Sequence, residues 1–345
     1  MILFLVMAGA LWGIGAMMQA PHRVRWTMIG VLYLAVVLVH AVLPPGHALR
    51  LATGGSLPEW VLVGVAAVAI VAYRRWLRGL RARAQAKAPQ PAEQPGAFTP
   101  IELERYARHI VLREVGGPGQ KKLKDARVLV IGAGGLGSPA LLYLAAAGVG
   151  TIGVVDDDVV DLSNLQRQVI HTDARLGMPK VFSAEQAMRA RNPHVTVRPY
   201  QRRLGADAAA ELFADYDLVL DGTDNFDTRF LVNRAAVATK TPLIAAAITQ
   251  WEGQVSLYDP ANGGPCYQCV FPKAPAPELA PSCAEAGVVG ALPGVVGAMM
   301  AMEAIKHITG AGQSLRGRML LYDALYAENR VVTLKRRVDC PVCGR

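Results

Sequence analysis

The sequence predicts an α/β protein with a Rossmann-like, mostly parallel sheet and flanking helices, preceded by about three transmembrane helices. Three observations predict this fold class. From about residue 101 onward, short buried strands alternate with helical patterns, which is typical of a parallel sheet covered on both faces. A glycine-rich turn, Gly132–Gly137, joins the first strand to a helix. Three apolar stretches follow one another within the first 75 residues, and none has an amphipathic period.

The apolar stretches are Met1–Met18, Trp26–Leu43 and Leu57–Tyr73, each about 17 or 18 residues long and almost free of charge. This length is at the short end of what crosses a bilayer as a helix. Met1–Met18 has no basic n-region and no small-residue cleavage signature, which favours a membrane span over a signal peptide. The alternative is a set of buried helices in a soluble domain, but three such stretches in succession favour the membrane.

The positive charge of the chain is concentrated beside these stretches. Residues 1–93 carry nine Lys and Arg against two acids, which gives +7 of the total net charge of +9. The basic residues follow the first and third stretches, and the loop between the second and third offers only Arg50. By the positive-inside rule, the N-terminus faces outward and everything after Tyr73 faces the cytosol. We therefore expect a multi-pass protein of the inner (cytoplasmic) membrane, and, because the rest of the chain is nearly neutral, no nucleic-acid partner.

Composition divides the chain into three parts. Residues 1–75 form the transmembrane region, and residues 76–100 form a linker that is first basic and then rich in proline and alanine. The stretch 84–100 lacks a hydrophobic period and is expected to be flexible. Residues 101–345 form one domain that carries the motifs described below.

That domain opens with a helical pattern and a glycine-rich turn at 116–119. Aliphatic runs such as RVLVI predict buried strands, and apolar residues with a period near 3.6 predict the helices between them. We expect strands at 127–131, 151–155, 195–199, 218–220, 243–247 and 254–258. We expect helices at 101–112, 138–147, 180–192, 206–214, 228–239 and 294–309, followed by a C-terminal strand pair.

Two neighbouring motifs predict a nucleotide site. In Gly132-Ala133-Gly134-Gly135-Leu136-Gly137, the glycines let the backbone approach a phosphate at the N-terminus of the following helix. Asp156 ends the next strand, 24 residues after Gly132, where it can accept hydrogen bonds from ribose hydroxyls. On its own, this pair is also typical of a dinucleotide-dependent oxidoreductase.

The segment that starts at Asp156, DDDVVDLSNLQRQ, favours ATP, because polar and cationic groups crowd where a dehydrogenase has an adenine-lining loop. Arg167 and, in the GMPK motif that follows, Lys180 can neutralise a triphosphate. Asn164 and Gln168 can orient it. The alternative for Arg167 is a surface ion pair.

A later strand ends in Asp221-Gly222-Thr223-Asp224-Asn225. A carboxylate at the C-terminal edge of a parallel strand is where a Mg²⁺ ligand would meet the phosphates. The alternative role of Asp221 or Asp224 is to cap the next helix. Taken together with the preceding segment, the motif predicts an ATP site rather than a hydride-transfer site.

Four of the five cysteines form two CxxC pairs, Cys266 with Cys269 and Cys340 with Cys343. This spacing predicts a closed tetrahedral zinc site that pins the C-terminal strand region back onto the fold. Two disulfides are the alternative, and the cytosolic side predicted for the domain disfavours them. The fifth, Cys283, stands apart after a proline-rich loop, and the plain alternative for it is a small buried thiol.

In their order along the chain, these motifs resemble the MoeB/ThiF/HesA family, the bacterial relatives of ubiquitin-activating enzymes. The resemblance covers residues 101–345 and includes RYARHI, GAGGLGS, DDDVVDLSNLQRQ, GMPK, DGTDN, CYQC, CAEAGVVG and CPVC. It implies an enzyme, an adenylyltransferase that uses ATP and Mg²⁺ and contains Zn²⁺. The implied substrate is the C-terminal glycine of a MoaD- or ThiS-like ubiquitin-fold sulfur carrier ending in Gly-Gly. Adenylation releases pyrophosphate and leads towards a carrier thiocarboxylate for molybdopterin or thiamine biosynthesis.

By position, the resemblance implies a catalytic set of Arg108, Arg167, Lys180, Asp224 and Cys283. Asp224 would bind Mg²⁺, and Arg108 would reach the phosphates of a neighbouring subunit, which implies a homodimer. Cys283 would bond covalently to the carrier or to incoming sulfur. The implied nucleotide-binding residues are Gly132, Gly134, Gly135, Gly137, Asp156, Asp158, Ser163, Asn164, Arg167, Gln168, Lys180, Asp224 and Asn225.

Two features depart from the family pattern. The membrane spans are not part of the usual catalytic unit, and no sulfurtransferase domain follows Cys343, so we expect a separate sulfur-donor protein. Two alternative functions stay open: an inactive or specialised membrane-bound scaffold of the same fold, and a dinucleotide-dependent oxidoreductase.

Overall fold

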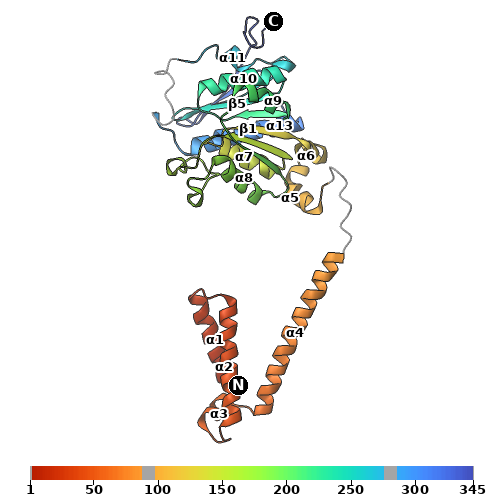
Figure 1. Ribbon diagram of the computed structural model, residues 1–345, viewed down its shortest axis with the longest axis vertical. Coiled ribbons are helices and arrows are strands. Elements are labelled where there is room, and N and C mark those ends of the chain that lie inside the picture. The colour runs from red at the N-terminus through yellow and green to blue at the C-terminus, as the bar shows by residue number, and fades with distance from the viewer. Residues whose placement is uncertain (1, 88–97, 276–285, 345) are drawn as a thin grey trace. The chain divides into compact units, whose positions relative to one another are not determined.

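A computed structural model describes residues 2–87, 98–275 and 286–344 of the chain (Figure 1). The chain divides into two compact units, Met1–Ala92 and Glu93–Arg345. The first holds the apolar helices and the second holds the α/β domain, and each is described by itself.

The N-terminal unit consists of helices only. Its elements are α1 (Ile2–Met17), α2 (His22–Val42), α3 (Ala48–Thr53) and α4 (Leu57–Lys87). Two helical segments, His22–Val42 and Leu57–Leu77, are long and apolar enough to cross a membrane. The expectation of a third span at Met1–Met18 is wrong, because α1 has only 16 residues. At a rise of about 1.5 Å per residue it extends about 24 Å, short of the hydrocarbon core.

The linker expected from residue 76 also needs correction at its start. Helix α4 continues from Leu57 through Lys87 without interruption. Its last part is rich in Arg, Ala, Leu and Lys, which are good helix formers, and the next proline is Pro89. The proline-rich residues 88–97 lie outside the described residues.

The second unit is built on one eight-stranded sheet in the order β3-β2-β1-β4-β5-β6-β7-β8. The strands are β1 (Arg127–Ile131), β2 (Thr151–Asp156), β3 (Thr196–Gln201), β4 (Leu218–Asp221), β5 (Leu243–Ile248), β6 (Glu252–Tyr258), β7 (Arg318–Asp323) and β8 (Glu328–Thr333). From β3 to β5 the neighbours are parallel, and from β5 to β8 they are antiparallel. The mostly parallel sheet expected from the sequence is confirmed.

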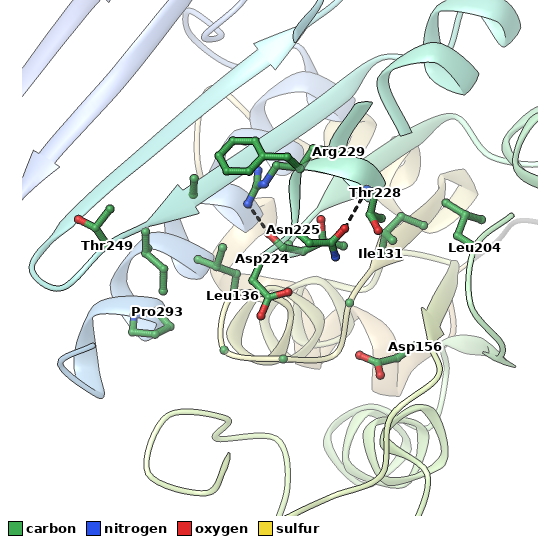
Figure 2. A pocket seen from close by; sticks show the side chains of 18 of the residues that line it. Ile131, Leu136, Asp156, Leu204, Asp224, Asn225, Thr228, Arg229, Thr249 and Pro293 are labelled. Carbon is green, nitrogen blue, oxygen red and sulfur yellow. Dashed lines mark hydrogen bonds between the residues drawn. The ribbon is translucent and has the colours of Figure 1, made fainter. Parts of the chain in front are cut away.

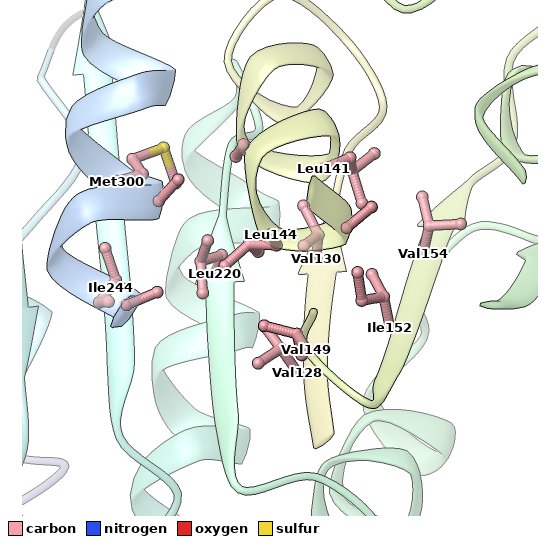
Figure 3. Packing of buried hydrophobic residues seen from close by; sticks show 14 of the residues in the cluster. Val128, Val130, Leu141, Leu144, Val149, Ile152, Val154, Leu220, Ile244 and Met300 are labelled. Atoms are coloured by element: carbon pink, nitrogen blue, oxygen red, sulfur yellow. The ribbon is translucent and has the colours of Figure 1, made fainter. Parts of the chain in front are cut away.

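Helices cover both faces of the parallel strands. They are α5 (Pro100–Ile110), α6 (Gly116–Asp125), α7 (Gly137–Ala147), α8 (Lys180–Arg191), α9 (Ala206–Ala214), α10 (Phe226–Thr239), α11 (Tyr267–Val270) and α13 (Ala291–Thr309). Alternate residues of β1 enter two different cores, since Val130 packs with α7, α8 and α13 while Leu129 packs with α9 and α10. Figure 3 shows Leu144 of α7 beside Leu220 of β4, and Met300 of α13 above Ile244 of β5. Burial on both faces explains why β1 reads as a continuous apolar run.

The glycine-rich segment at 116–119, expected as a turn, is instead the first turn of α6. Two contacts further along this helix fix it to the domain. Leu123 is fully buried, and Gln120 Nε2 donates a hydrogen bond of 2.7 Å to the carbonyl of Ala147. Tertiary packing therefore overrides the low helix propensity of Gly116, Gly117 and Gly119.

Candidate active site

A cavity of about 1300 Å³ opens where the parallel strands β1, β2 and β4 end. This is the position at which open α/β sheets bind ligands. In Figure 2, Asp156 lies on one side of the cavity, Thr249 and Pro293 lie on the other, and Asp224 lies between them. The predicted nucleotide-binding residues that line it are Gly132, Gly134, Gly135, Asp156, Asp158, Arg167, Gln168, Lys180, Asp224 and Asn225.

The glycine-rich loop between β1 and α7 tolerates no side chain at its ends. Gly132 has a φ of +93°, in the left-handed region. A Cβ on Gly137 would lie 1.9 Å from the carbonyl oxygen of Gly132, and one on Gly135 would lie 3.0 Å from Pro293. At Gly134, in contrast, Gln168 is the neighbour within 4 Å, at 3.8 Å. The loop therefore packs tightly at its ends and leaves room at its middle for a phosphate.

Asp156 holds the loop from the end of β2. One carboxylate oxygen accepts from the backbone N–H of Ala133 at 2.7 Å, and the other accepts from Asp158 at 2.9 Å. Burial raises the pKa of Asp156, and the two backbone hydrogen bonds oppose that rise. Each carboxylate oxygen has a further lone pair, so Asp156 can still accept from the hydroxyls of a ribose.

Lys180 and Arg167, the cations predicted to bind the phosphates, also line the cavity. Lys180 is almost fully buried, and its Nζ lies 2.8 Å from the carboxylate of Asp158. Arg167 is half-buried and donates to the carbonyl of Ser163 at 3.0 Å. Gln168 is buried, yet its Oε1 has no hydrogen-bond partner among the described residues. Buried acceptors in proteins nearly always have a hydrogen-bond donor. The unpartnered Oε1 of Gln168 therefore indicates that a bound polar group can donate to it.

The loop after β4 brings carboxylates to the same edge. Asp221 is buried, and its Oδ1 accepts from the N–H and the hydroxyl of Thr223 at 2.9 and 2.6 Å. Asn225, not Asp221 or Asp224, caps α10 by accepting from the N–H of Thr228 at 2.9 Å. Asp224 is exposed and lines the cavity, so it is the acid of this motif that is placed to face a bound cation.

Four predicted site residues are not part of the cavity wall. Gly137 starts α7, Ser163 and Asn164 lie in a short 3-10 helix, η1 (Leu162–Asn164), and none of the three lines the cavity. Arg108 is exposed on α5. Cys283 lies outside the described residues.

His171 was missed by sequence reasoning and anchors the glycine-rich loop. Its Nε2 lies 2.9 Å from the carbonyl of Ala133, and its Nδ1 lies 2.9 Å from the hydroxyl of Ser183. A carbonyl can only accept, so Nε2 carries the proton and Nδ1 accepts from Ser183. Burial is the main cause that lowers the pKa of His171 to about 4. His171 lies between the DDDVVDLSNLQRQ and GMPK motifs, but no residue pattern there pointed to this role.

Arg229 of α10 is the second residue that sequence reasoning missed. It is 5% exposed and lines the cavity. Its Nη2 donates to the carbonyl of Thr223 and, at 2.8 Å, to that of Ala246 in β5. The guanidinium thus links the loop that carries Asp224 to strand β5 by hydrogen bonds. Its position four residues after the end of the DGTDN motif was the signal available.

The four CxxC cysteines form a separate buried cluster, with all four sulfurs within 4.8 Å of one another. The Sγ atoms of Cys266 and Cys340 are 3.6 Å apart, and those of Cys269 and Cys343 are 3.4 Å apart. All four cysteines are free, so the disulfide alternative is wrong. A tetrahedral site with Zn–S bonds of about 2.3 Å brings sulfurs about 3.8 Å apart, so the cluster fits Zn²⁺.

The surroundings of the cluster also suit a bound cation. The backbone N–H of Arg337 donates to Cys269 Sγ at 3.4 Å, and Asn233 Nδ2 lies 3.8 Å from Cys266 Sγ. Such N–H···S contacts favour thiolates. Burial raises the pKa of both Cys266 and Cys269, which disfavours their thiolate forms. A bound divalent cation would reverse this effect.

Comparison with known proteins agrees with this geometry. The model of the family described as ThiF family matches residues 106–342. The chain belongs to the ThiF family. The resemblance noted in the sequence is thereby confirmed, since the matched residues include the glycine-rich loop, both sides of the cavity and three of the four clustered cysteines.

ThiF-family relatives of this chain carry adenylyltransferase names. It is 51% identical over 251 residues to the sulfur carrier protein adenylyltransferase of Thermus thermophilus, covering 72% of this chain and 93% of that one. It is 51% identical over 256 residues to the probable adenylyltransferase/sulfurtransferase MoeZ of Mycobacterium tuberculosis, covering 73% and 65%. Against the adenylyltransferase and sulfurtransferase of Bos taurus the identity is 48%, covering 74% and 56%. The chain thus spans less than two thirds of the two bifunctional relatives.

Solved structures share the fold of this ThiF-family chain. A crystal structure of E. coli MccB with ATP has a TM-score of 0.58 and 22% identity, covering 66% of this chain and 70% of that one. The structure of PaaA has a TM-score of 0.60 and 22% identity, covering 76% and 83%. At this identity the likeness concerns the fold alone.

Proposed function

We propose that this chain is an ATP-dependent adenylyltransferase that activates the C-terminal glycine of a ubiquitin-like sulfur carrier ending in Gly-Gly. The observation that carries the proposal is one cavity that combines a glycine-rich loop, the acid Asp156, the predicted phosphate-binding cations Arg167 and Lys180, and the exposed carboxylate of Asp224. The names of the relatives support the same substrate class. The product serves as a precursor of carrier thiocarboxylate for molybdopterin or thiamine biosynthesis.

The chain's own residues contribute position and charge to this reaction. A C-terminal carboxylate has a pKa of about 3.5, so it is ionised near pH 7 and needs no general base. One of its oxygens bonds to the α-phosphorus while the bond from that phosphorus to the β-bridging oxygen breaks. The electron pair leaves with pyrophosphate. Lys180 and Arg167 neutralise the charge of the triphosphate, so that two anions can approach each other.

Asp224 is the residue proposed to hold Mg²⁺, since its carboxylate is exposed at the cavity edge and oxygen ligands suit this ion. Bound there, the ion supplies further neutralisation of phosphate charge. The zinc proposed for the cysteine cluster has a structural role, because four protein ligands leave no open position. It joins the C-terminal segment to α11.

The direct test is carrier-dependent exchange of pyrophosphate into ATP. Full-length protein in detergent is incubated with ATP, Mg²⁺ and MoaD- or ThiS-like proteins ending in Gly-Gly. The wild type should catalyse exchange, and Asp224→Ala should abolish it, whereas Asp227→Ala on the exposed face of α10 should not. Absence of exchange with every carrier, or carrier-dependent oxidation of a nicotinamide nucleotide, would contradict the proposal. A pure scaffold would bind the carrier without exchange.

We further propose that α2 and α4 hold the enzyme at the inner membrane with the α/β domain in the cytosol. Two spans, rather than three, put the N-terminus on the cytosolic side, and Arg23 and Arg25 at the start of α2 then lie on that side as well. The active unit is a homodimer in which Arg108 acts across the interface.

A further inference from the structure

Arg229 is a buried cation that has no role in the reaction proposed above. Its side chain is only 5% exposed, yet it lines the active-site cavity. Two of its five N–H donors are engaged, both on Nη2, by the carbonyls of Thr223 and Ala246. Within the described part of the chain, the three donors on Nη1 and Nε have no hydrogen-bond acceptor.

The charge of Arg229 is also incompletely balanced. It forms no ion pair with a carboxylate among the residues that the structure describes, although an arginine this deeply buried is normally paired. Asp221 is the buried acid of the same region. Burial is the main cause that raises the pKa of Tyr267. The charge of Arg229 lowers this pKa and the charge of Asp221 raises it, so both charges are felt at the Tyr267 hydroxyl. The Oδ1 of Asp221 nevertheless accepts from Thr223, and its Oδ2 has no hydrogen-bond partner among the described residues, so Asp221 makes no hydrogen bond to the guanidinium.

The order of the strands separates Arg229 from the nucleotide. Ribose is assigned to Asp156 at the end of β2, and the phosphates to the glycine-rich loop after β1. The next strands in the sheet are β4, which leads to Asp224, and β5, whose Ala246 accepts from Arg229. Figure 2 shows Arg229 beyond Asp224, away from Asp156. The part of the cavity at β4 and β5 is therefore left for the second substrate.

We propose that Arg229 is the residue that receives the carrier's terminal carboxylate before it attacks ATP. This inference rests on the proposed function. A guanidinium is the group that best matches a carboxylate, and a cation without a partner anion on a cavity wall favours an incoming anion. When the carboxylate becomes an acyl-adenylate, it loses its negative charge, so the attraction that held the carboxylate ends with the reaction.

The test compares two synthetic peptides that differ only at the last group, one ending in Gly-Gly carboxylate and one in Gly-Gly carboxamide. Binding is measured by calorimetry to full-length protein in detergent, with a non-hydrolysable ATP analogue present. The wild type should bind the carboxylate peptide roughly tenfold or more tightly than the carboxamide. Arg229→Gln should remove most of this preference, and Arg229→Lys should keep part of it. Arg234→Gln, at an exposed arginine of the same helix, should change nothing.

Steady-state kinetics separate binding from structural damage. Arg229→Gln should raise the KM for a Gly-Gly carrier in pyrophosphate exchange by roughly tenfold or more and leave the KM for ATP within about twofold. If the wild type supports no exchange with any carrier, the proposed function itself fails. If the wild type prefers the carboxylate and Arg229→Gln keeps that preference, only the role of Arg229 is overturned. Loss of cooperative melting in both Arg229 variants would likewise overturn it, since Arg229 would then be a structural anchor.

Discussion

At the scale of residues, the glycine-rich loop is fixed by side chains far from it in the sequence. Asp156 holds the N–H of Ala133, and His171 holds its carbonyl. The backbone N–H and the carbonyl of Ala133 are thus both hydrogen-bonded, while the neighbouring Gly134 stays open to the cavity. The sequence identified Asp156 because it ends a strand at a familiar spacing. It did not identify His171, because its role depends only on which residue lies above the loop in space.

We predict that His171 makes the domain less stable in mild acid. Its pKa is lowered to about 4 in the folded state from 6.5, so its stabilising effect is complete above about pH 6.5 and is lost as the pH falls towards 4. Between pH 7 and pH 5 the loss amounts to about 2 kcal/mol. Urea unfolding at both pH values should show this difference, and it should shrink in His171→Leu.

The control for this prediction is His194→Leu, which changes an exposed histidine and should leave the pH dependence unaltered. An equal pH dependence in wild type and His171→Leu would mean that other groups cause the acid sensitivity.

At the scale of elements, local patterns predicted the strands well and the irregular segments poorly. β1 was predicted with its observed bounds, because a run of aliphatic residues buried on both faces has a pattern of its own. The turn expected at 116–119 is helical, because Leu123 and Gln120 pack against the domain and decide the conformation of the glycines before them. The two CxxC pairs were found by spacing, but only the fold shows that residues 74 positions apart meet.

The cysteine cluster leads to a prediction about metal content. Purified wild-type protein should contain about one zinc per chain, and Cys340→Ser should lose most of it and melt at a lower temperature, since structural zinc binding is coupled to folding. Elemental analysis with thermal melting measures both effects. Cys283→Ser, outside the four, should keep its zinc. An active wild-type enzyme without zinc would refute the assignment.

At the scale of the whole molecule, the chain joins a helical unit with membrane-compatible helices to a ThiF-family domain. The basic residues that gave the chain its net charge belong to the first unit. An adenylyltransferase relative matches 72% of this chain. The membrane-compatible helices and the ThiF-family domain therefore fall on different parts of the sequence.

This division predicts that a chain starting near Pro95 is soluble and still catalyses carrier-dependent pyrophosphate exchange, because the cavity residues all follow this point. In the full-length protein, a reporter fused after Arg83 should be cytosolic, and one fused after Pro45 should be external. Sedimentation, exchange assays and reporter activity measure these outcomes. An external reporter after Arg83 would show that the charge argument is mistaken.

The proposed homodimer leads to a mixing experiment. Arg108 is exposed on α5 and does not line the cavity of its own chain, as expected if it serves a neighbour. Arg108→Ala and Asp224→Ala chains should each be inactive, and mixed dimers should recover part of the exchange activity, because one of their two sites has both residues intact. Inactive mixed dimers, shown to form by tag-based capture, would exclude action across the interface.

The sequence by itself determined the family, the strands and most of the helices of the α/β domain, with α6 and α11 as exceptions, and the residues that carry the motifs. These features are local, so a run of neighbours or a fixed spacing is enough to specify them. Only the tertiary structure decided that α1 is too short to span and that Arg167 and Gln168 line the cavity while Ser163 and Asn164 do not. It also decided that His171 supports the glycine-rich loop and that Arg229 lines the cavity. Those facts depend on the ends of separate strands meeting at one edge of the sheet, a contact between distant residues that no local pattern contains.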